Sequence, residues 1–398
     1  MSTAPSLRRV KKYALGPLAL REYFRNCGDG RSSPRKSAGD LVWAVIAGQL
    51  LRETSFHSVE ALAQAAPQRS LGIHSRFGDD TLAYFTERLD PEPTRQALAG
   101  VLRSAKRNKA FESSAFIGLA LDGTAVGRCA DKGCDLCRPY RNAKQEIVGY
   151  RHHLAMISVV GAGIALPFDV EPYGPGDSEY AAAQRLLRRA IPTINVRFAD
   201  YIVVDAGLAT ATFLHAASET GLPVLARLKD NLPELCGSVE RRFGSEPPHR
   251  VLNDGKDRVE LWDADDFAPW ETLKWPSVRV VRYRRRQPDG TISQGDWLTN
   301  LPSAKFQSLS VFRMGRSRWE IENEGFNDCK SRQGLEHICH HHSNSLLLCW
   351  LLTLLALVMG RLYRIRHLHR GTHPVRTAAE LVRLLWLSLG RSAALNSS

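Results

Sequence analysis

Apolar and polar residues alternate with helical spacing through the first part of the chain. Amphipathic segments occur around residues 37–54, 58–66 and 81–105, and breaks rich in Gly, Pro and Ser separate them. Apolar positions that recur every three to four residues are typical of helices packed on a core. The pattern therefore predicts a helical N-terminal region over residues 1–110.

From residue 111 the pattern changes to short apolar runs. It predicts strands in FIGLALDGTAVG, in YRHHLAMISVVGAGIALPFDVEP (two strands joined by a glycine turn), in YIVVDAGLA and in PVLARLKDN. SEYAAAQRLLRRAI and TATFLHAASETG have helical spacing. We expect the first strand to end on Asp122 and the strand in YIVVDAGLA to end on Asp205. This order predicts a mixed α/β sheet flanked by helices, with its first part over residues 111–232.

The later chain divides into three further regions. Residues 233–302 contain alternating, turn-punctuated segments such as VELWDADDF and VRVVRYRRR, which predict a β-rich insertion. Residues 303–345 return to the core with one charged helix, and residues 346–398 predict a helical C-terminal region. The run LLLCWLLTLLALVMG is shorter than the ~20 residues that span a membrane, so we expect a buried core helix and no membrane association.

The charged helix RWEIENEGFNDCK carries one glutamate on its apolar side. At about 100° per residue, Glu322 falls within the apolar stripe, whereas Glu320 and Glu324 point away from it. The stripe consists of Phe312, Trp319, Phe326 and Cys329. A carboxylate on a packed face is unfavourable unless it is paired or binds a metal ion, so Glu322 is a candidate metal ligand.

Asp122, Asp205 and Glu322 together have the chemistry of a Mg²⁺ or Mn²⁺ site. These ions prefer oxygen ligands, and two of them roughly 3.5–4 Å apart promote phosphodiester displacement. For either aspartate alone, a turn-capping role explains an Asp next to Gly equally well. The two aspartates together, with Glu322 and a basic chain, favour the metal site.

The charge and cysteine content narrow the functional classes. The 398 residues include 54 Lys and Arg against 41 Asp and Glu, a net charge of +13, which indicates a polyanionic partner such as nucleic acid. Eight cysteines are too few for a disulfide scaffold of this size. The N-terminus has no apolar stretch of signal-peptide length, so we expect a cytoplasmic protein.

Between Phe77 and Arg364 the chain resembles the DDE transposases of bacterial insertion sequences. The resemblance rests on ALDGT, VVDAGLATATFL, WLTNLP and RWEIENEGFNDCK. It implies an RNase H-like core with a β-rich insertion, two divalent cations (Mg²⁺ or Mn²⁺), and catalytic and metal-binding roles for Asp122, Asp205 and Glu322. It also implies DNA cleavage at the inverted-repeat ends of a transposon, strand transfer into target DNA, and a homodimer in the DNA complex.

The match departs from the family signature at two positions. Gly315 stands where the family has tyrosine, and Lys330 follows the glutamate one residue late. Arg318, one helical turn before Glu322, would orient that carboxylate or hold a DNA phosphate. Lys330 would contact a phosphate near the transposon end. Either cation could instead be a solvated helix charge, and Glu324 is a reserve candidate for the third metal ligand.

Further DNA-binding candidates lie in the insertion. Arg284 and Arg285 belong to the RYRRR cluster, which binds a phosphate backbone or forms a solvated strand face. Trp297 either stacks on an unpaired base or packs in the core. The run CHHH at 339–342 is best interpreted as a polar helix end, with a metal cluster or a phosphate-binding patch as alternatives.

Three cysteines follow the first aspartate at C-x4-C-x2-C spacing. Three free thiols are the favoured interpretation of Cys129, Cys134 and Cys137. The alternative is a structural zinc site, which requires a fourth ligand. His152 or His153 on the following strand would supply it.

Three functions are compatible with this sequence. The intact carboxylate triad favours a transposase. The missing tyrosine at Gly315 leaves open a catalytically inactive DNA-binding relative. A metal-dependent DNA nuclease without strand transfer would use the same three carboxylates, and only the joining of DNA ends distinguishes it from a transposase.

Overall fold

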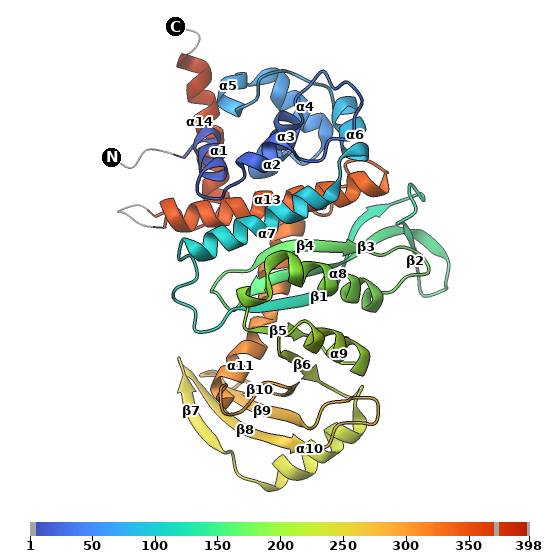
Figure 1. The fold of residues 1–398 in the computed structure, drawn as a ribbon, viewed down its shortest axis with the longest axis vertical. Coiled ribbons are helices and arrows are strands. Elements are labelled where there is room, and N and C mark those ends of the chain that lie inside the picture. The colour runs from blue at the N-terminus through green and yellow to red at the C-terminus, as the bar shows by residue number, and fades with distance from the viewer. Residues whose placement is uncertain (1–4, 370–373, 396–398) are drawn as a thin grey trace.

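The computed structural model describes residues 5–369 and 374–395. Helices occupy the described part of the N-terminal region, as predicted, and lie at one end of the elongated molecule (Figure 1). The predicted segment 81–105 is two helices rather than one, because Asp90 caps a new helix that begins with Pro91. The helices are α1 (Leu7–Leu15), α2 (Arg21–Arg25), α3 (Ala38–Leu51), α4 (Phe56–Ala65), α5 (Gln68–Leu71), α6 (Asp79–Arg88) and α7 (Pro91–Arg107).

A ten-stranded mixed sheet forms the centre and the opposite end of the molecule (Figure 1). Its strands are β1 (Gly118–Cys129), β2 (Arg138–Arg141), β3 (Ile147–Val160), β4 (Leu166–Pro172), β5 (Tyr201–Val204), β6 (Val224–Leu228), β7 (Arg250–Asp254), β8 (Asp257–Phe267), β9 (Val278–Arg286) and β10 (Ile292–Thr299). The order is β2-β3-β1-β5-β6-β10-β9-β8-β7, and β4 also pairs with β3. β5 is parallel to both β1 and β6, and the other neighbours are antiparallel. The predicted mixed α/β fold is therefore confirmed, and the insertion strands β7–β10 extend the core sheet rather than forming a separate one.

The first strand differs from its prediction. β1 does not end on Asp122 but continues to Cys129, because β3 pairs with it over almost its whole length. A side chain at Gly123 would overlap the carboxylate of Glu179 in α8 (Glu179–Ile194), so a larger residue there would displace the Glu179 side chain. β5 ends at Val204, and Asp205 follows it directly, as predicted.

The remaining helices cover the sheet and join it to the N-terminal region. They are the 3₁₀ turn η1 (Val196–Phe198), α9 (Ala211–Glu219), α10 (Pro233–Ser245), α11 (Ser308–Ser317), the π-helix η2 (Ile321–Phe326), α12 (Asn327–Arg332), α13 (Ser343–His367) and α14 (Ala378–Leu395). α10 was not expected in the β-rich insertion. Within the described ranges, α13 alone is long and apolar enough to span a membrane, and 94% of its most apolar window is buried inside the protein, as expected of a core helix.

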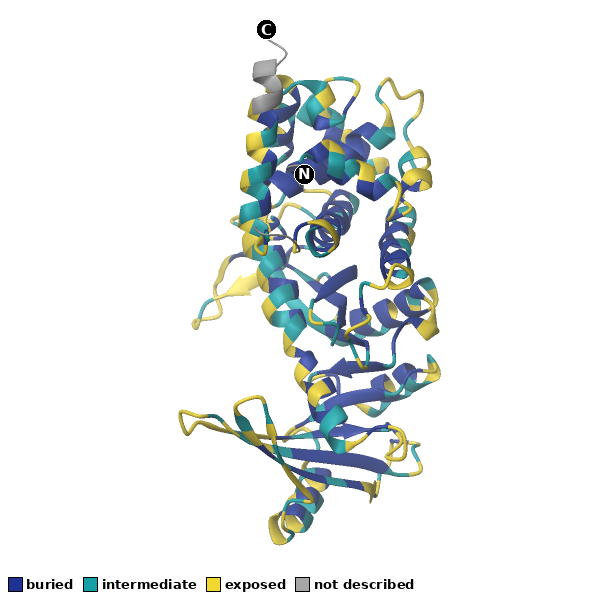
Figure 2. Ribbon diagram, turned by 90° about the vertical axis from the view of Figure 1, so that its left-hand side faces the viewer, coloured by how far each residue is buried: buried dark blue, intermediate teal, exposed yellow. Residues whose placement is uncertain are grey.

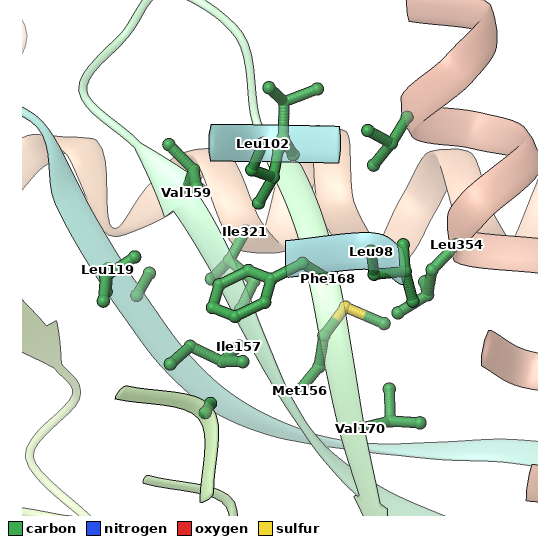
Figure 3. Close-up of a cluster of buried hydrophobic side chains, with 14 of the residues drawn as sticks. Leu98, Leu102, Leu119, Met156, Ile157, Val159, Phe168, Val170, Ile321 and Leu354 are labelled. Carbon is green, nitrogen blue, oxygen red and sulfur yellow. The ribbon is translucent and has the colours of Figure 1, made fainter. Parts of the chain in front are cut away.

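A continuous apolar core supports the helix that carries the charged motif. Figure 3 shows Ile321, from the first turn of η2, beside Phe168 of β4 and the neighbouring core residues of β1 and β3. Ile321 is fully buried. The residue directly before Glu322 is therefore anchored in the core. The protruding hairpin that contains β2 is largely exposed (Figure 2).

Candidate active site

The parallel pairing of β1 with β5 brings the two aspartates together. Leu121 pairs with Val204, so Asp122 and Asp205 follow a matched pair of residues on adjacent strands. The backbone N–H of Gly123 donates to Oδ1 of Asp122 (2.9 Å). The N–H of Leu208 donates to Oδ1 of Asp205 (3.1 Å). One oxygen of each carboxylate thus accepts a backbone hydrogen bond. Asp205 therefore caps a turn, as considered above, and also lies beside Asp122.

Arg318 joins the third carboxylate to the first. Its Nη1 donates to Oε1 of Glu322 at 2.6 Å and to Oδ2 of Asp122 at 3.1 Å. The side chain of Arg318 is only 10% exposed. The structure therefore brings Asp122, Asp205 and Glu322, which are far apart in the sequence, to one place beside a buried guanidinium.

Burial dominates the electrostatics of Asp122, and the charges of the neighbouring carboxylates add to its effect. Burial raises the pKa of Asp122 to about 7; Arg318 opposes this, and the charges of Asp205 and Glu322 add to it. Three carboxylates face one arginine, so the fully ionised cluster carries two excess negative charges. Oxygen donors with an uncompensated negative charge suit divalent cations such as Mg²⁺ and Mn²⁺, and the residues at this site fit such ions.

The helical wheel assigned three residues to the wrong face of this helix: it placed Trp319 in the core and Glu320 and Glu324 in solvent. Trp319 is 54% exposed, and η2 is a π-helix, whose wider turn shifts later side chains away from their α-helical positions. The N–H of Gly161 donates to Glu320 (2.9 Å) and that of Ala165 to Glu324 (3.1 Å). Both flanking glutamates thus hold η2 on the β3–β4 turn, and burial raises the pKa of Glu320 to about 7.

The two cations near Glu322 are both engaged by the protein. The contacts of Arg318 with Asp122 and Glu322 fit the orienting role predicted for it, and its contact with a DNA phosphate stays a prediction. Nζ of Lys330 donates to Oγ1 of Thr124 at 2.6 Å and lies 3.7 Å from Glu336. Lys330 is therefore not a solvated helix charge, and it lies beside β1 two residues beyond Asp122.

Trp297 explains the departure from the tyrosine of the family signature. A Cβ atom at Gly315 would overlap the Trp297 ring, and Trp297 is only 2% exposed. The guanidinium of Arg227 lies over the same ring, 5.4 Å from its centroid. Trp297 therefore packs in the core beside Gly315, as one of its two predicted roles required, and its stacking on an unpaired base stays a prediction.

The insertion cations lie farther from the carboxylates. β9 is three strand spacings from β5, roughly 14 Å. Nε of Arg285 donates to Oδ2 of Asp257 at 2.5 Å, so its charge is already paired. Arg284 faces solvent, with Glu260 at 3.9 Å. Of this predicted pair, Arg284 is the cation available at the surface.

A cleft of about 1080 Å³ opens beside Asp205 and contains residues that the sequence analysis missed. Lys229, Arg188 and His215 line it, together with Trp270. Lys229 directly follows β6, the strand next to β5, so its position after a buried strand was the available signal. The cleft gives Asp205 an open approach lined by the cations of Arg188 and Lys229 and by the carboxylates of Glu219 and Asp230.

The cysteines and one of the two candidate histidines meet at the far end of β1. Cys129, Cys134 and Cys137 lie around the buried ring of His152, while His153 packs against Tyr173 instead. The run CHHH at 339–342 is not merely a polar helix end, because it places a histidine beside these cysteines.

Comparisons with known proteins identify the family. The family model described as "Transposase DDE domain" matches residues 114–359, more than half of the chain and a range that includes all three carboxylates. No match was found among curated proteins. Among solved structures, the chain is similar to a piggyBac transposase in a synaptic complex with hairpin DNA, with 11% identity and a TM-score of 0.46, over 98% of this chain and 78% of that chain. The protein belongs to the DDE transposase family.

Proposed function

We propose that the protein is an active DNA transposase that cleaves DNA at the inverted-repeat ends of its element and joins the new 3′ ends to target DNA. The observation that carries this proposal is the meeting of Asp122, Asp205 and Glu322 around the single guanidinium of Arg318. A structural ion cluster would contain as many cations as anions. This one retains the excess negative charge that a metal-dependent phosphoryl-transfer site requires.

The three carboxylates would hold two divalent cations, Mg²⁺ or Mn²⁺. When bound, such ions activate the attacking oxygen and stabilise the leaving oxygen in phosphodiester displacement. Arg318 keeps Asp122 and Glu322 facing each other. Glu320 and Glu324 fix η2 on the β3–β4 turn, so that Glu322 is presented at a constant position.

Double-stranded DNA is the proposed partner, at the transposon ends and at the target. The net charge of +13 favours a polyanion. Lys229 and Arg188 line the cleft at Asp205, and Arg284 adds a surface cation on the insertion. Lys330, beside β1, is placed to contact a phosphate if it releases Thr124. Pairing two transposon ends requires two active sites, so a homodimer forms the DNA complex in this proposal.

The test is cleavage and strand joining by the purified protein on DNA that carries the inverted repeats of its own element, with Mg²⁺ or Mn²⁺. The wild type is compared with Glu322→Gln and with Glu324→Gln. Glu324→Gln makes the same chemical change two residues further along the helix and keeps an oxygen that accepts the Ala165 N–H. We expect joining by the wild type and Glu324→Gln and none by Glu322→Gln.

The other outcomes assign a different function. Cleavage of the ends without joining identifies a metal-dependent nuclease. Specific binding of the ends, with neither reaction, identifies a catalytically inactive DNA-binding relative. Loss of joining in Glu324→Gln but not in Glu322→Gln overturns the assignment of the third carboxylate.

A further inference from the structure

Three side chains at the end of β1 have the spacing of ligands to one metal ion. The Sγ atoms of Cys134 and Cys137 are 3.7 Å apart, and Nε2 of His152 lies 3.2 Å from the first and 3.4 Å from the second. A tetrahedral zinc ion with Zn–S bonds of about 2.3 Å and Zn–N bonds of about 2.0 Å separates two sulfurs by about 3.8 Å, and a sulfur from a nitrogen by about 3.5 Å. The three atoms therefore already lie near three corners of such a tetrahedron.

These contacts are not explained by a disulfide or by ordinary core packing. A separation of 3.7 Å is far longer than the roughly 2.05 Å of a disulfide bond. The ring of His152 is fully buried, and its Nε2 points at the two sulfurs. Thiols are weak hydrogen-bonding partners for a buried imidazole, whereas thiolate and imidazole are the preferred ligands of zinc.

A fourth ligand comes from the last residue of β1. Cys129 lies with Cys137 and His152 in a group whose candidate ligand atoms are all within 4.8 Å of one another. We propose that Cys129, Cys134, Cys137 and His152 bind one structural Zn²⁺ ion. The site would join the end of β1, the loop before β2 and the middle of β3.

The proposed site and the carboxylates share β1 and one face of the sheet. In the β1–β3 pairing, Asp122 lies opposite Met156 and Val126 opposite His152, so the two sites are four residues apart along the strand, roughly 13 Å. The segment that comes after α12 in the sequence lies alongside the same strand, β1. The N–H of Gly127 donates to Glu336 (2.8 Å), and His341 lies within 4.8 Å of Cys134 and Cys137. The zinc ion would thus fix the far end of the strand that carries Asp122.

The primary test is the metal content of the full-length protein, purified without chelators. We expect one zinc per chain. After exchange with Co²⁺ we expect the visible absorption of a tetrahedral site and a strong thiolate-to-cobalt charge-transfer band. Cys129→Ser, Cys137→Ser and His152→Ala should each lose the stoichiometric metal, whereas Cys236→Ser, a cysteine of α10 in the insertion, should retain it.

Two further measurements keep the test decisive if a variant folds poorly. The wild type is titrated with a zinc chelator, and its circular dichroism is followed; we expect metal release to lower the thermal midpoint. Glu322→Gln should retain its zinc, so a failure of the proposed transposase activity does not affect this result. Metal content near zero, or a Cys134–Cys137 disulfide in the purified protein, would overturn the proposal. Retention by Cys129→Ser with loss in His341→Ala would overturn the ligand set, because His341 would then be the fourth ligand.

Discussion

Two buried clusters of acids and arginines lie on the same sheet, and they differ in their charge balance. At β4, Asp169 is 3% exposed and accepts from Nε of Arg95 (3.1 Å) and from Nε of Arg189 (3.0 Å). Arg189 also donates to Glu171 at 2.6 Å. At β1, Asp122 shares a single arginine with Glu322 and lies beside Asp205.

The difference separates a structural cluster from a binding site. Three arginines, Arg95, Arg185 and Arg189, face Asp169, Glu171 and Asp177 in this network, so its charges balance without a ligand. Around Asp122 one arginine faces three carboxylates, and burial raises the pKa of Asp122 to about 7, so either protonation of Asp122 or a bound cation compensates the excess negative charge. Similar residues in similarly buried positions therefore have different roles: those at β4 stabilise the fold, and those at β1 form a binding site. Substitutions at the two clusters are expected to have opposite consequences for activity and for stability.

The largest expected effect is on catalysis by the β1 cluster. Asp122→Asn and Glu322→Gln should each reduce end cleavage and joining by about 10³-fold or more, because each removes a proposed ligand of the catalytic cations. The melting temperature should not fall, since each neutral amide relieves repulsion between carboxylates. A loss of activity with a matching loss of folded protein would remove the distinction between the two clusters.

At the β4 cluster the large effect should be on stability. Asp169→Asn leaves Arg95 and Arg189 buried without their common counter-ion, and we expect it to lower the free energy of unfolding by about 3–5 kcal/mol. Chemical denaturation measures this change, with Asp254→Asn, whose partner Arg313 is largely exposed, as the control. An Asp169→Asn protein as stable as the wild type would show that the charge balance of the β4 cluster is not required for the stability of the fold.

Stabilisation by a bound divalent cation should depend on the β1 cluster and not on the β4 cluster. Mg²⁺ or Mn²⁺ at about 100 times its dissociation constant should stabilise the wild type by roughly 2.7 kcal/mol for one bound ion. The same shift should persist in Asp169→Asn and disappear in Asp122→Asn. Thermal melts with and without the ion, at constant zinc loading, measure it. An equal shift in all three proteins would place the cation elsewhere.

The smallest expected effect concerns Glu320, which supports the site without belonging to the carboxylate cluster. Its folded-state pKa of about 7 exceeds its ordinary value of 4.5, so folding is favoured when it is protonated. This contribution is complete below pH 4.5 and is lost as the pH rises to 7. Glu320→Gln cannot ionise, and we expect it to be more stable than the wild type by about 1–3 kcal/mol at pH 8.

The pH dependence of Glu320→Gln distinguishes this cause from a general packing effect. The advantage over the wild type should vanish at pH 4, where both side chains are neutral. Thermal melts at the two pH values give the comparison. A constant difference at both values would mean that ionisation of Glu320 is not its origin.

The strand that carries each aspartate could be predicted from the sequence, because buried strands leave a contiguous apolar signal. Asp205 follows β5 as expected, and the core helix α13 is where its apolar run indicated. The length of β1 beyond Asp122 could not be predicted, because it depends on pairing with β3 rather than on local hydrophobicity. Long-range pairing was the missing information.

The helix around Glu322 shows a second reason why the sequence could not predict the whole site. The wheel selected Glu322, but it also placed the exposed Trp319 in the core, because it assumed one regular α-helix where α11 ends at Ser317 and η2 is a π-helix. Arg318 was recognised as a neighbour of Glu322 but not as its bridge to Asp122, which lies 196 residues earlier in the chain. Likewise, nothing local indicates that Gly315 makes room for Trp297.

The pairing of β10 with β6 has a consequence for how this chain could be remodelled. Leu228, where β6 ends, lies directly opposite Asp296. The chain therefore leaves the core and returns to it at neighbouring points, and residues 229–295 form an excursion whose two ends are held together by the sheet. Segments of different length or shape could be exchanged between these points while Thr299 stays paired with Leu225 and the route onward to Glu322 is preserved. An exchanged segment would also have to cover the helix before Glu322, because Phe312 of α11 is buried against Val259 and Leu261 of β8.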